Sequence, residues 1–269
     1  MFQGKAMTFL TTIFYMVIVK CVVGQISYHN GNIMSNGIKV YYIWYGNFST
    51  SQKNLVANFT RDLNSSSWWD ITRQYNISGI GYNGAKTVQA SSKLLAFTDI
   101  ENLVKTNAGV GNTDAIYVVL TDKTVNQRNG NTYFCKNYCG WHSTTVINGK
   151  IIKFAWIGSP LYCAKTYGQN VCSGLSSVTN NAPNGNFEID SFINTIAHEI
   201  TETATDPSSF GWYDTQGNEN ADKCAWQFGN TSKGTLVNPS GVWNQRIGNR
   251  CFYIQNNWRL LPVQGCSQK

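Results

Sequence analysis

The hydrophobic positions of this chain alternate between the two-residue period of β-strands and the longer period of helices. The runs 38–45 and 115–120 consist almost entirely of β-branched and aromatic residues and predict buried strands. Two more runs flank Asn148-Gly149, a dipeptide typical of a tight hairpin turn. The predicted strands are 38–45, 86–92, 115–120, 141–147 and 151–157.

Apolar residues recur at intervals of three and four in four other segments, which we expect to be helices. The first covers 51–63, and two shorter patterns cover 67–75 and 98–106. The longest covers 188–205, where the apolar residues form one stripe and Asp206-Pro207 ends the helix.

The order of these elements predicts the fold class. Strands and helices alternate at first, several strands follow, and one long helix comes late in the chain. We therefore expect a single, disulfide-bonded α+β domain over residues 25–269. It would have a mixed β-sheet, flanking helices and a long central motif helix in a zincin-like arrangement. The segment 159–186 is rich in Cys, Gly, Ser and Asn and is expected to be a loop.

Acidic residues are concentrated around the motif helix. Eight of the 14 Asp and Glu residues lie between positions 188 and 222, although the chain has a formal charge of +7. Carboxylates crowded together repel each other unless a positive charge lies among them, and a metal ion is the simplest candidate. The basic residues are scattered without a run or stripe, which argues against a nucleic-acid partner.

The motif helix carries the sequence His198-Glu199-Ile200-Thr201-Glu202. Helical spacing of four brings His198 and Glu202 to one face, as in zinc peptidases, whose second ligand is a histidine. Glu199 would then act as the general base that deprotonates water. A third ligand must come from elsewhere: the candidates are Asp222 first, with Glu219 or His142 as substitutes.

Other interpretations of the same residues remain open. A carboxylate-rich set suits calcium at least as well as zinc, so the expected cofactor is a divalent metal of either kind. The acidic cluster could also be purely structural, or Glu199 and Asp222 could serve a glycosidase. The pairs Trp68-Trp69 and Trp212-Tyr213 could stack on sugars, although such aromatics more often lie in the core.

Residues 1–24 have the pattern of a secretory signal peptide, with Lys5 before an apolar run at 9–19 and cleavage expected before Gln25. We expect no membrane span in the mature chain, because no later segment is long and apolar enough. Removal of Lys5 and Lys20 lowers the formal charge from +7 to +5. Five sequons predict N-glycosylation at Asn47, Asn58, Asn64, Asn76 and Asn230.

The mature chain keeps seven of the eight cysteines, because Cys21 leaves with the signal peptide. In an oxidising compartment seven cysteines indicate disulfides and one odd thiol. The pairs that we expect are Cys135–Cys139, Cys163–Cys172 and Cys224–Cys266; the first two would close local loops.

The chain resembles the EXORDIUM-like, phosphate-induced family of secreted proteins. The resemblance is collinear over essentially all of the mature chain. Its segments are 28–31 (YHNG), 38–48 (IKVYYIWYGNF), 67–69 (SWW), 115–121 (AIYVVLT), Cys135, 139–142 (CGWH), 197–202 (AHEITE), 221–224 (ADKC) and Cys266. Cys251 has no counterpart in the family pattern, and the resemblance therefore implies that Cys251 is the free thiol.

The resemblance also implies an extracellular or cell-wall location and a link to growth or cell expansion, without an established reaction. We therefore expect a secreted protein associated with an extracellular matrix or cell-wall component, with a candidate metal site. The alternatives are a zincin-like metallohydrolase that uses His-Glu-x-x-Glu, and a carbohydrate-binding matrix protein.

Overall fold

The computed structural model describes residues 24–167 and 171–269. The predicted signal peptide, 1–24, lies outside this part of the chain apart from Gly24. Among the described residues, no helix combines the length and apolarity that crossing a bilayer requires.

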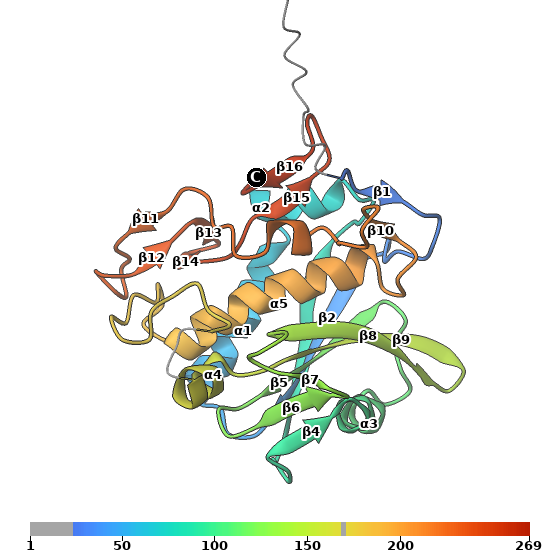
Figure 1. Ribbon diagram of the computed structural model, residues 1–269, viewed down its shortest axis with the longest axis horizontal. Helices are drawn as coiled ribbons and strands as arrows, with labels where there is room; N and C mark the ends of the chain where they lie inside the picture. Colours follow the sequence, from blue (N-terminus) through green and yellow to red (C-terminus); the bar gives the residue numbers. More distant parts are fainter. Residues whose placement is uncertain (1–23, 168–170) are drawn as a thin grey trace, which may run out of the picture.

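A five-stranded mixed sheet forms the centre of the molecule (Figure 1). Its strands are β2 (Ile38–Tyr45), β3 (Ile80–Val88), β5 (Ala115–Thr121), β8 (Gly140–Ile147) and β9 (Lys150–Ile157). The spatial order is β3-β2-β5-β9-β8. The first four strands are parallel, and β8 is an antiparallel edge strand joined to β9 by the predicted hairpin. The predicted α+β class and mixed sheet are therefore confirmed.

The helices cover both faces of this sheet. They are α1 (Thr50–Leu63), α2 (Ser67–Arg73), α3 (Phe97–Asn107), α4 (Pro160–Tyr167) and α5 (Phe187–Thr205). Figure 1 shows α5 and α1 on one side of the sheet and α3 on the other, beside a small second sheet. That second sheet consists of β4 (Leu94–Ala96), β6 (Asn126–Asn129) and β7 (Thr132–Tyr133).

Short antiparallel pairs complete the fold. They are β1 (Ser27–Tyr28) with β10 (Trp212–Tyr213), β11 (Ser232–Lys233) with β12 (Val242–Trp243), β13 (Gln245–Ile247) with β14 (Arg250–Phe252), and β15 (Asn257–Arg259) with β16 (Gly265–Ser267). A 3-10 turn, η1 (Asp222–Cys224), lies between β10 and β11. The pairing of β1 with β10 holds the beginning of the described chain against its C-terminal half.

The alternation of side chains along the strands explains why the central sheet contributes to a separate hydrophobic cluster on each of its faces. On β2, Val40, Tyr42 and Trp44 belong to the cluster that also contains α1, α2 and α5. The intervening Ile43 and Tyr45 belong to a second cluster with α3 and the inner residues of β9. Because successive side chains of a strand point to opposite faces, a continuous apolar run is what a strand buried on both faces requires.

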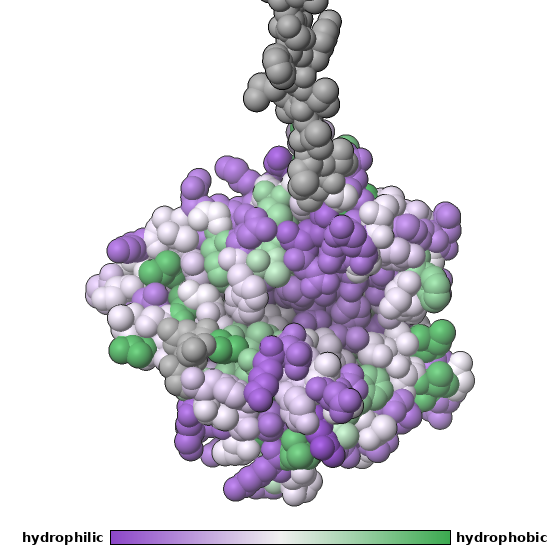
Figure 2. All heavy atoms as spheres, in the orientation of Figure 1, coloured by the Kyte–Doolittle hydropathy of each residue, from purple (hydrophilic) through white to green (hydrophobic). Residues whose placement is uncertain are grey.

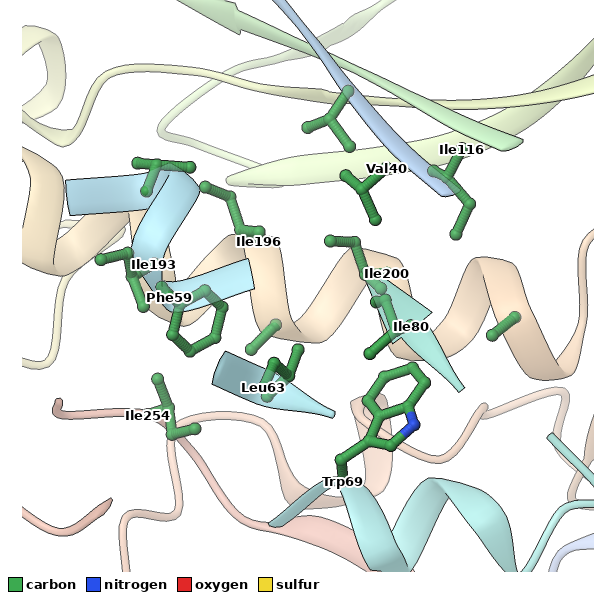
Figure 3. Packing of buried hydrophobic residues seen from close by; sticks show 14 of the residues in the cluster. Val40, Phe59, Leu63, Trp69, Ile80, Ile116, Ile193, Ile196, Ile200 and Ile254 are labelled. Atoms are coloured by element: carbon green, nitrogen blue, oxygen red, sulfur yellow. The ribbon is translucent and has the colours of Figure 1, made fainter. Parts of the chain in front are cut away.

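Helix α5 is the most deeply buried helix of this fold, and every one of its residues except His198 is buried. Figure 3 shows Ile196 and Ile200 of α5 lying between sheet residues such as Val40 and α1 residues such as Phe59. Because the polar residues of α5 are buried as well, apart from His198, this helix differs from an ordinary surface helix, whose polar side faces solvent.

The segment 159–186 was expected to be a loop, and this prediction is wrong for Pro160–Tyr167, which forms α4. The helix is anchored by Cys163, which is fully buried and disulfide-bonded to Cys135. Helix α4 also packs against α5. Tertiary contacts therefore stabilise a helix whose local sequence gives only a weak periodic signal.

The two local disulfides expected from the sequence, Cys135–Cys139 and Cys163–Cys172, are both wrong. The structure pairs Cys135 with Cys163 and Cys139 with Cys172, with Cα–Cα distances of 5.5 and 5.3 Å. A disulfide needs Cα atoms about 4.4–6.8 Å apart and suitably directed side chains. Packing brings Cys163 of α4 to this distance from Cys135, and Cys172 to this distance from Cys139.

The remaining cysteines follow the expected scheme. Cys224 is bonded to Cys266, which ties η1 to β16 at the end of the chain. Cys251 is free among the described residues and is half-buried on β14.

Candidate metal centre

A cavity of about 510 Å³ opens beside the middle of α5. Its walls contain His198 and Glu199 of α5, Gly140 at the start of β8, Asp222 of η1, and the disulfide-bonded loop 135–139. Figure 2 shows hydrophilic residues gathered in a hollow in the middle of this face, over α5. The motif helix therefore faces a polar cleft between the edge of the sheet and the C-terminal segments.

Local sequence determines where α5 begins and ends. The side chain of Asn186 caps the helix by accepting a hydrogen bond from the N–H of Ile189. Asp206 follows the last helical residue and precedes Pro207, which disfavours the helical backbone at the residue before it. His198 and Glu202 therefore lie one turn apart in the second half of the helix, and His198 lines the cavity.

Asp222 completes a first group with these two side chains. The Nε2 atom of His198 lies 3.1 Å from Oε2 of Glu202 and 3.4 Å from Oδ1 of Asp222. One ligand atom from each residue lies within 4.8 Å of the other two, so the three could share one ion. Oε1 of Glu202 accepts a hydrogen bond from the N–H of Asp222 at 2.9 Å, which fixes the carboxylate relative to η1.

The position of Asp222 depends on its two neighbours in η1. Cys224 anchors the turn through its disulfide with Cys266. Lys223 forms a buried ion pair with Asp214, with 2.8 Å between Nζ and Oδ2, and donates a hydrogen bond to the carbonyl of Gly24. A buried cation and a covalent bond thus hold a half-exposed ligand candidate in place.

A second group surrounds His142 on β8. Its Nδ1 atom lies 3.5 Å from Oε2 of Glu199 and 3.9 Å from Oε2 of Glu202. Its Nε2 atom lies 3.8 Å from Oε1 of Glu219 and 3.3 Å from the carbonyl oxygen of Asp206. His142, Glu202 and Glu219 also have ligand atoms within 4.8 Å of one another.

The carboxylates around the two histidines favour their protonated forms. Burial would lower the pKa of His142, but the hydrogen bond to Glu199 and the charges of Glu219, Glu199 and Glu202 raise it to about 10. The pKa of His198 is raised well above its usual value, because Glu202 and Asp222 outweigh the effect of burial. The site thus attracts positive charge to the space between these side chains.

The carboxyl groups respond differently according to their depth. Burial and the charge of Glu202 raise the pKa of Glu219 to about 9, and burial also raises the pKa of Glu202 itself. The pKa of Asp222 is lowered, because contacts with His198 outweigh burial. Carboxyl groups that are costly to ionise when alone become good ligands when a cation is bound among them.

Glu199 lies against the backbone of β8. A Cβ atom at Gly140 would lie 2.7 Å from Oε1 of Glu199 and 2.9 Å from Cγ2 of Thr195, so only glycine lets the strand approach this closely. Glu199 is almost fully buried, yet it lines the cavity beside His198. This placement suits a general base that faces a bound molecule.

The structure thus brings together every residue that the sequence named as a ligand or base. The three alternatives for a ligand outside the helix, Asp222, Glu219 and His142, all lie at the site. The tryptophans proposed for sugar stacking do not: Trp68 and Trp69 are fully buried, and Trp212 packs on Tyr75.

Sequence reasoning missed Trp226 and Gly140. Trp226 lines the cavity and is 46% exposed. The sequence places Gly140 directly after Cys139 and two residues before the candidate ligand His142. It places Trp226 two residues after Cys224 and four residues after the candidate ligand Asp222.

Comparison with known proteins identifies the family. The family described as "Phosphate-induced protein 1 conserved region" matches residues 26–240. No solved structure matches the chain. The relatives include "Protein EXORDIUM-like 3" of Arabidopsis thaliana, 29% identical over 221 residues that cover 70% of this chain and 64% of the relative.

"Protein PHOSPHATE-INDUCED 1" of Nicotiana tabacum is 30% identical, over 70% of this chain and 67% of its own length. "Protein EXORDIUM" of Arabidopsis thaliana is 30% identical, over 73% and 70%. The chain therefore spans about two thirds of the length of these relatives. A match over most of the chain to one family, together with these relatives, shows that the chain belongs to the phosphate-induced protein 1 family, which includes the EXORDIUM-like proteins.

Proposed function

We propose that this protein binds a divalent metal ion in its polar cleft through His198, Glu202 and Asp222 and acts as a metal-dependent hydrolase outside the cell. The observation that carries the proposal is the meeting of one imidazole nitrogen and two carboxylates within 4.8 Å of one another, two of which, His198 and Asp222, line a cavity of about 510 Å³. A buried structural cluster would not need a cavity beside it.

The donor set favours zinc over calcium. Calcium takes six to eight oxygen ligands, whereas zinc accepts imidazole nitrogen together with a few carboxylate oxygens. His198 belongs to the set, and the ring of His142 lies close by. A bound zinc ion would supply Lewis acidity, polarising a scissile carbonyl and lowering the pKa of water.

The chain's own residues have separate roles in this proposal. Glu199 lies beside His198 in the cavity wall and takes up the proton as general base. His142, whose Nδ1 is 3.5 Å from Glu199, orients that carboxylate and stabilises its charged form. Gly140 leaves room for the carboxylate against the edge strand. In this proposal Glu199 is thus positioned by His142 and Gly140, neither of which is a ligand of the ion held by His198, Glu202 and Asp222.

An extracellular setting is part of the proposal. Three disulfides require an oxidising compartment to persist. Of the predicted glycosylation sites, Asn47, Asn76 and Asn230 are exposed, whereas Asn58 and Asn64 are half-buried. The resemblance to the EXORDIUM-like family supports association with an extracellular matrix or cell wall and a role in growth or cell expansion.

The test begins with the metal content of the secreted protein, measured by elemental mass spectrometry. We expect bound zinc in the wild type and, in the same amount, in Glu101→Gln, a control on α3 across the sheet, and loss of the zinc ion held by His198, Glu202 and Asp222 in Asp222→Asn. Glu199→Gln should keep the metal and the melting temperature but abolish hydrolysis of a peptide library. Absence of any metal from the wild type would refute the proposal.

A second candidate function is carbohydrate binding, favoured by Trp226. This side chain is 46% exposed in the cavity wall, and its backbone has φ of 60°, a left-handed conformation that is costly for a bulky residue. An exposed ring held in this way suits stacking on a sugar. A glycan array would test it, with Trp226→Ala expected to lose any binding that the wild type shows.

A further inference from the structure

The proposed metal site leaves the group around His142 without a ligand-binding role. Both ring nitrogens of His142 face carboxylates, but the distances to Glu202 and Glu219 are 3.9 and 3.8 Å. A direct hydrogen bond would bring nitrogen and oxygen to about 2.7–3.2 Å. One ion can bind only one of the two ring nitrogens, and one ligand atom from each of His142, Glu202 and Glu219 lies within 4.8 Å of the other two, so the three could share an ion.

Glu219 supplies an independent observation. Its Oε1 atom is buried and has no hydrogen-bond partner among the described residues. The nearest ion-pair partner is Nε2 of His142, at 3.8 Å. A buried acceptor without a partner is costly, so native proteins seldom leave one unless a water or ion completes it.

Glu202 connects the two groups. Its Oε2 atom lies between the two histidines, 3.1 Å from Nε2 of His198 and 3.9 Å from Nδ1 of His142. Its Oε1 atom is already held by the N–H of Asp222. One carboxylate oxygen is therefore positioned to contact a cation on each side, as a bridging ligand does.

We propose that the cleft holds two divalent cations that share Glu202, one with His198 and Asp222 and the other with His142 and Glu219. The inference deepens the proposed function and rests on it, since the first ion is the one already proposed. Paired ions about 3.5–4 Å apart are typical of enzymes that act on phosphate esters or peptides.

The charge of the site agrees with two ions. Glu199, Glu202, Glu219 and Asp222 carry four negative charges when ionised. Among the described residues, no lysine or arginine forms an ion pair with any of them. Two divalent cations balance these four charges, whereas with a single ion the protonated ring of His142 is the one further counter-charge among the described residues at the site.

The experiment counts ions on the full, secreted chain. Protein stripped with a chelator is titrated with Zn²⁺ by calorimetry, and the bound zinc is measured after desalting. We expect two zinc ions per chain in the wild type and in the control Glu101→Gln, and one in Glu219→Gln and in Asp222→Asn. Glu219→Gln preserves the shape of the side chain, and its melting temperature verifies that it folds.

Manganese provides a readout that does not depend on a variant. Two Mn²⁺ ions that share a carboxylate oxygen are magnetically coupled, so the six-line spectrum of an isolated ion should give way to a coupled spectrum as the second equivalent binds. Two ions without coupling would overturn the shared Glu202.

The outcomes separate this inference from the proposed function. One zinc ion in the wild type that persists in Glu219→Gln and is lost in Asp222→Asn would overturn the second ion and leave the proposed function intact. One ion that is lost in both variants would mean that all these residues hold a single ion, which also overturns the inference. No bound zinc at all would overturn both.

Discussion

Replacing Lys223 with methionine removes the ammonium group that faces the buried carboxylate of Asp214. Lys223 and Asp214 are 5% and 1% exposed at their side chains, and 2.8 Å separates the charged atoms. Nζ of Lys223 also lies 4.3 Å from the centre of the Trp258 ring. Methionine keeps most of the apolar contact with this ring but leaves Asp214 buried without its cation.

The expected loss follows from these distances. At an effective dielectric constant of about 20, two unit charges 2.8 Å apart attract each other by about 6 kcal/mol, and desolvation offsets part of that. Breaking a buried ion pair on one side costs about 3–5 kcal/mol. Asp214 keeps hydrogen bonds from the N–H groups of Gln216 and Asn218, so we expect a value near the lower end, about 3 kcal/mol.

The assay is urea unfolding at pH 7 in a chelator, so that metal binding does not contribute. The contribution of this pair is fully present at that pH. Burial would raise the pKa of Asp214, but Lys223 and Asn218 hold it well below its usual range. The stability is therefore lost only as the pH falls through that lowered value.

The double variant Asp214→Asn/Lys223→Met is the decisive control, because it removes both charges. It should recover at least half of the loss, and Lys93→Met, at an exposed lysine, should cost almost nothing. A single-variant cost below about 1 kcal/mol, or a double variant no more stable than Lys223→Met, would refute the reasoning.

Three further predictions concern the site and its support. The metal-free protein should lose stability as the pH rises from about 6.5 to 10. The pKa of His142 is about 10 in the folded protein and about 6.5 in the unfolded chain, so protonation of this ring stabilises the fold fully below pH 6.5, and that contribution is lost as the pH rises to about 10. Melting temperatures in a chelator test this, and a profile unchanged in His142→Gln would contradict it. Gly140→Ala should lower hydrolysis by about 10–100-fold with little loss of zinc affinity, because the new Cβ would displace Glu199; kinetics and calorimetry on one preparation separate the two effects. Ile200→Ala should lower the free energy of unfolding by about 2–5 kcal/mol, because this fully buried side chain lies in the core of Figure 3, while Ile200→Val should cost about 0.5–1.5; equal costs would show that the cavity argument fails.

The sequence alone predicted the elements whose signals are local. The strand 38–45 and the helix 188–205 were found to within one residue, because each has a sustained apolar period and a clear end signal. The helical spacing of His198 and Glu202 likewise placed both on one face, since four residues make about one turn. These inferences needed no knowledge of what packs against each element.

Only the tertiary structure decided which distant segments meet. The sequence offered Asp222, Glu219 and His142 as alternatives for one ligand position, and the fold brings all three to the same helix. The reason is that the edge strand β8 packs against α5, while the backbone N–H of Asp222 in η1 donates a hydrogen bond to Glu202 of the same helix. Sequence separation carries no information about such contacts, because their free energy comes from burying whole elements together.

The disulfides illustrate the same division. Composition and the expected compartment predicted that most cysteines would be paired, but spacing favoured the neighbours Cys135 and Cys139. Packing of α4, whose helical signal was too weak to find, places Cys163 against Cys135 instead. Periodicity and residue chemistry therefore predicted the elements and the residues of the candidate site, and long-range packing alone determined which of them meet, because a local pattern encodes the shape of one segment and not the position of the next.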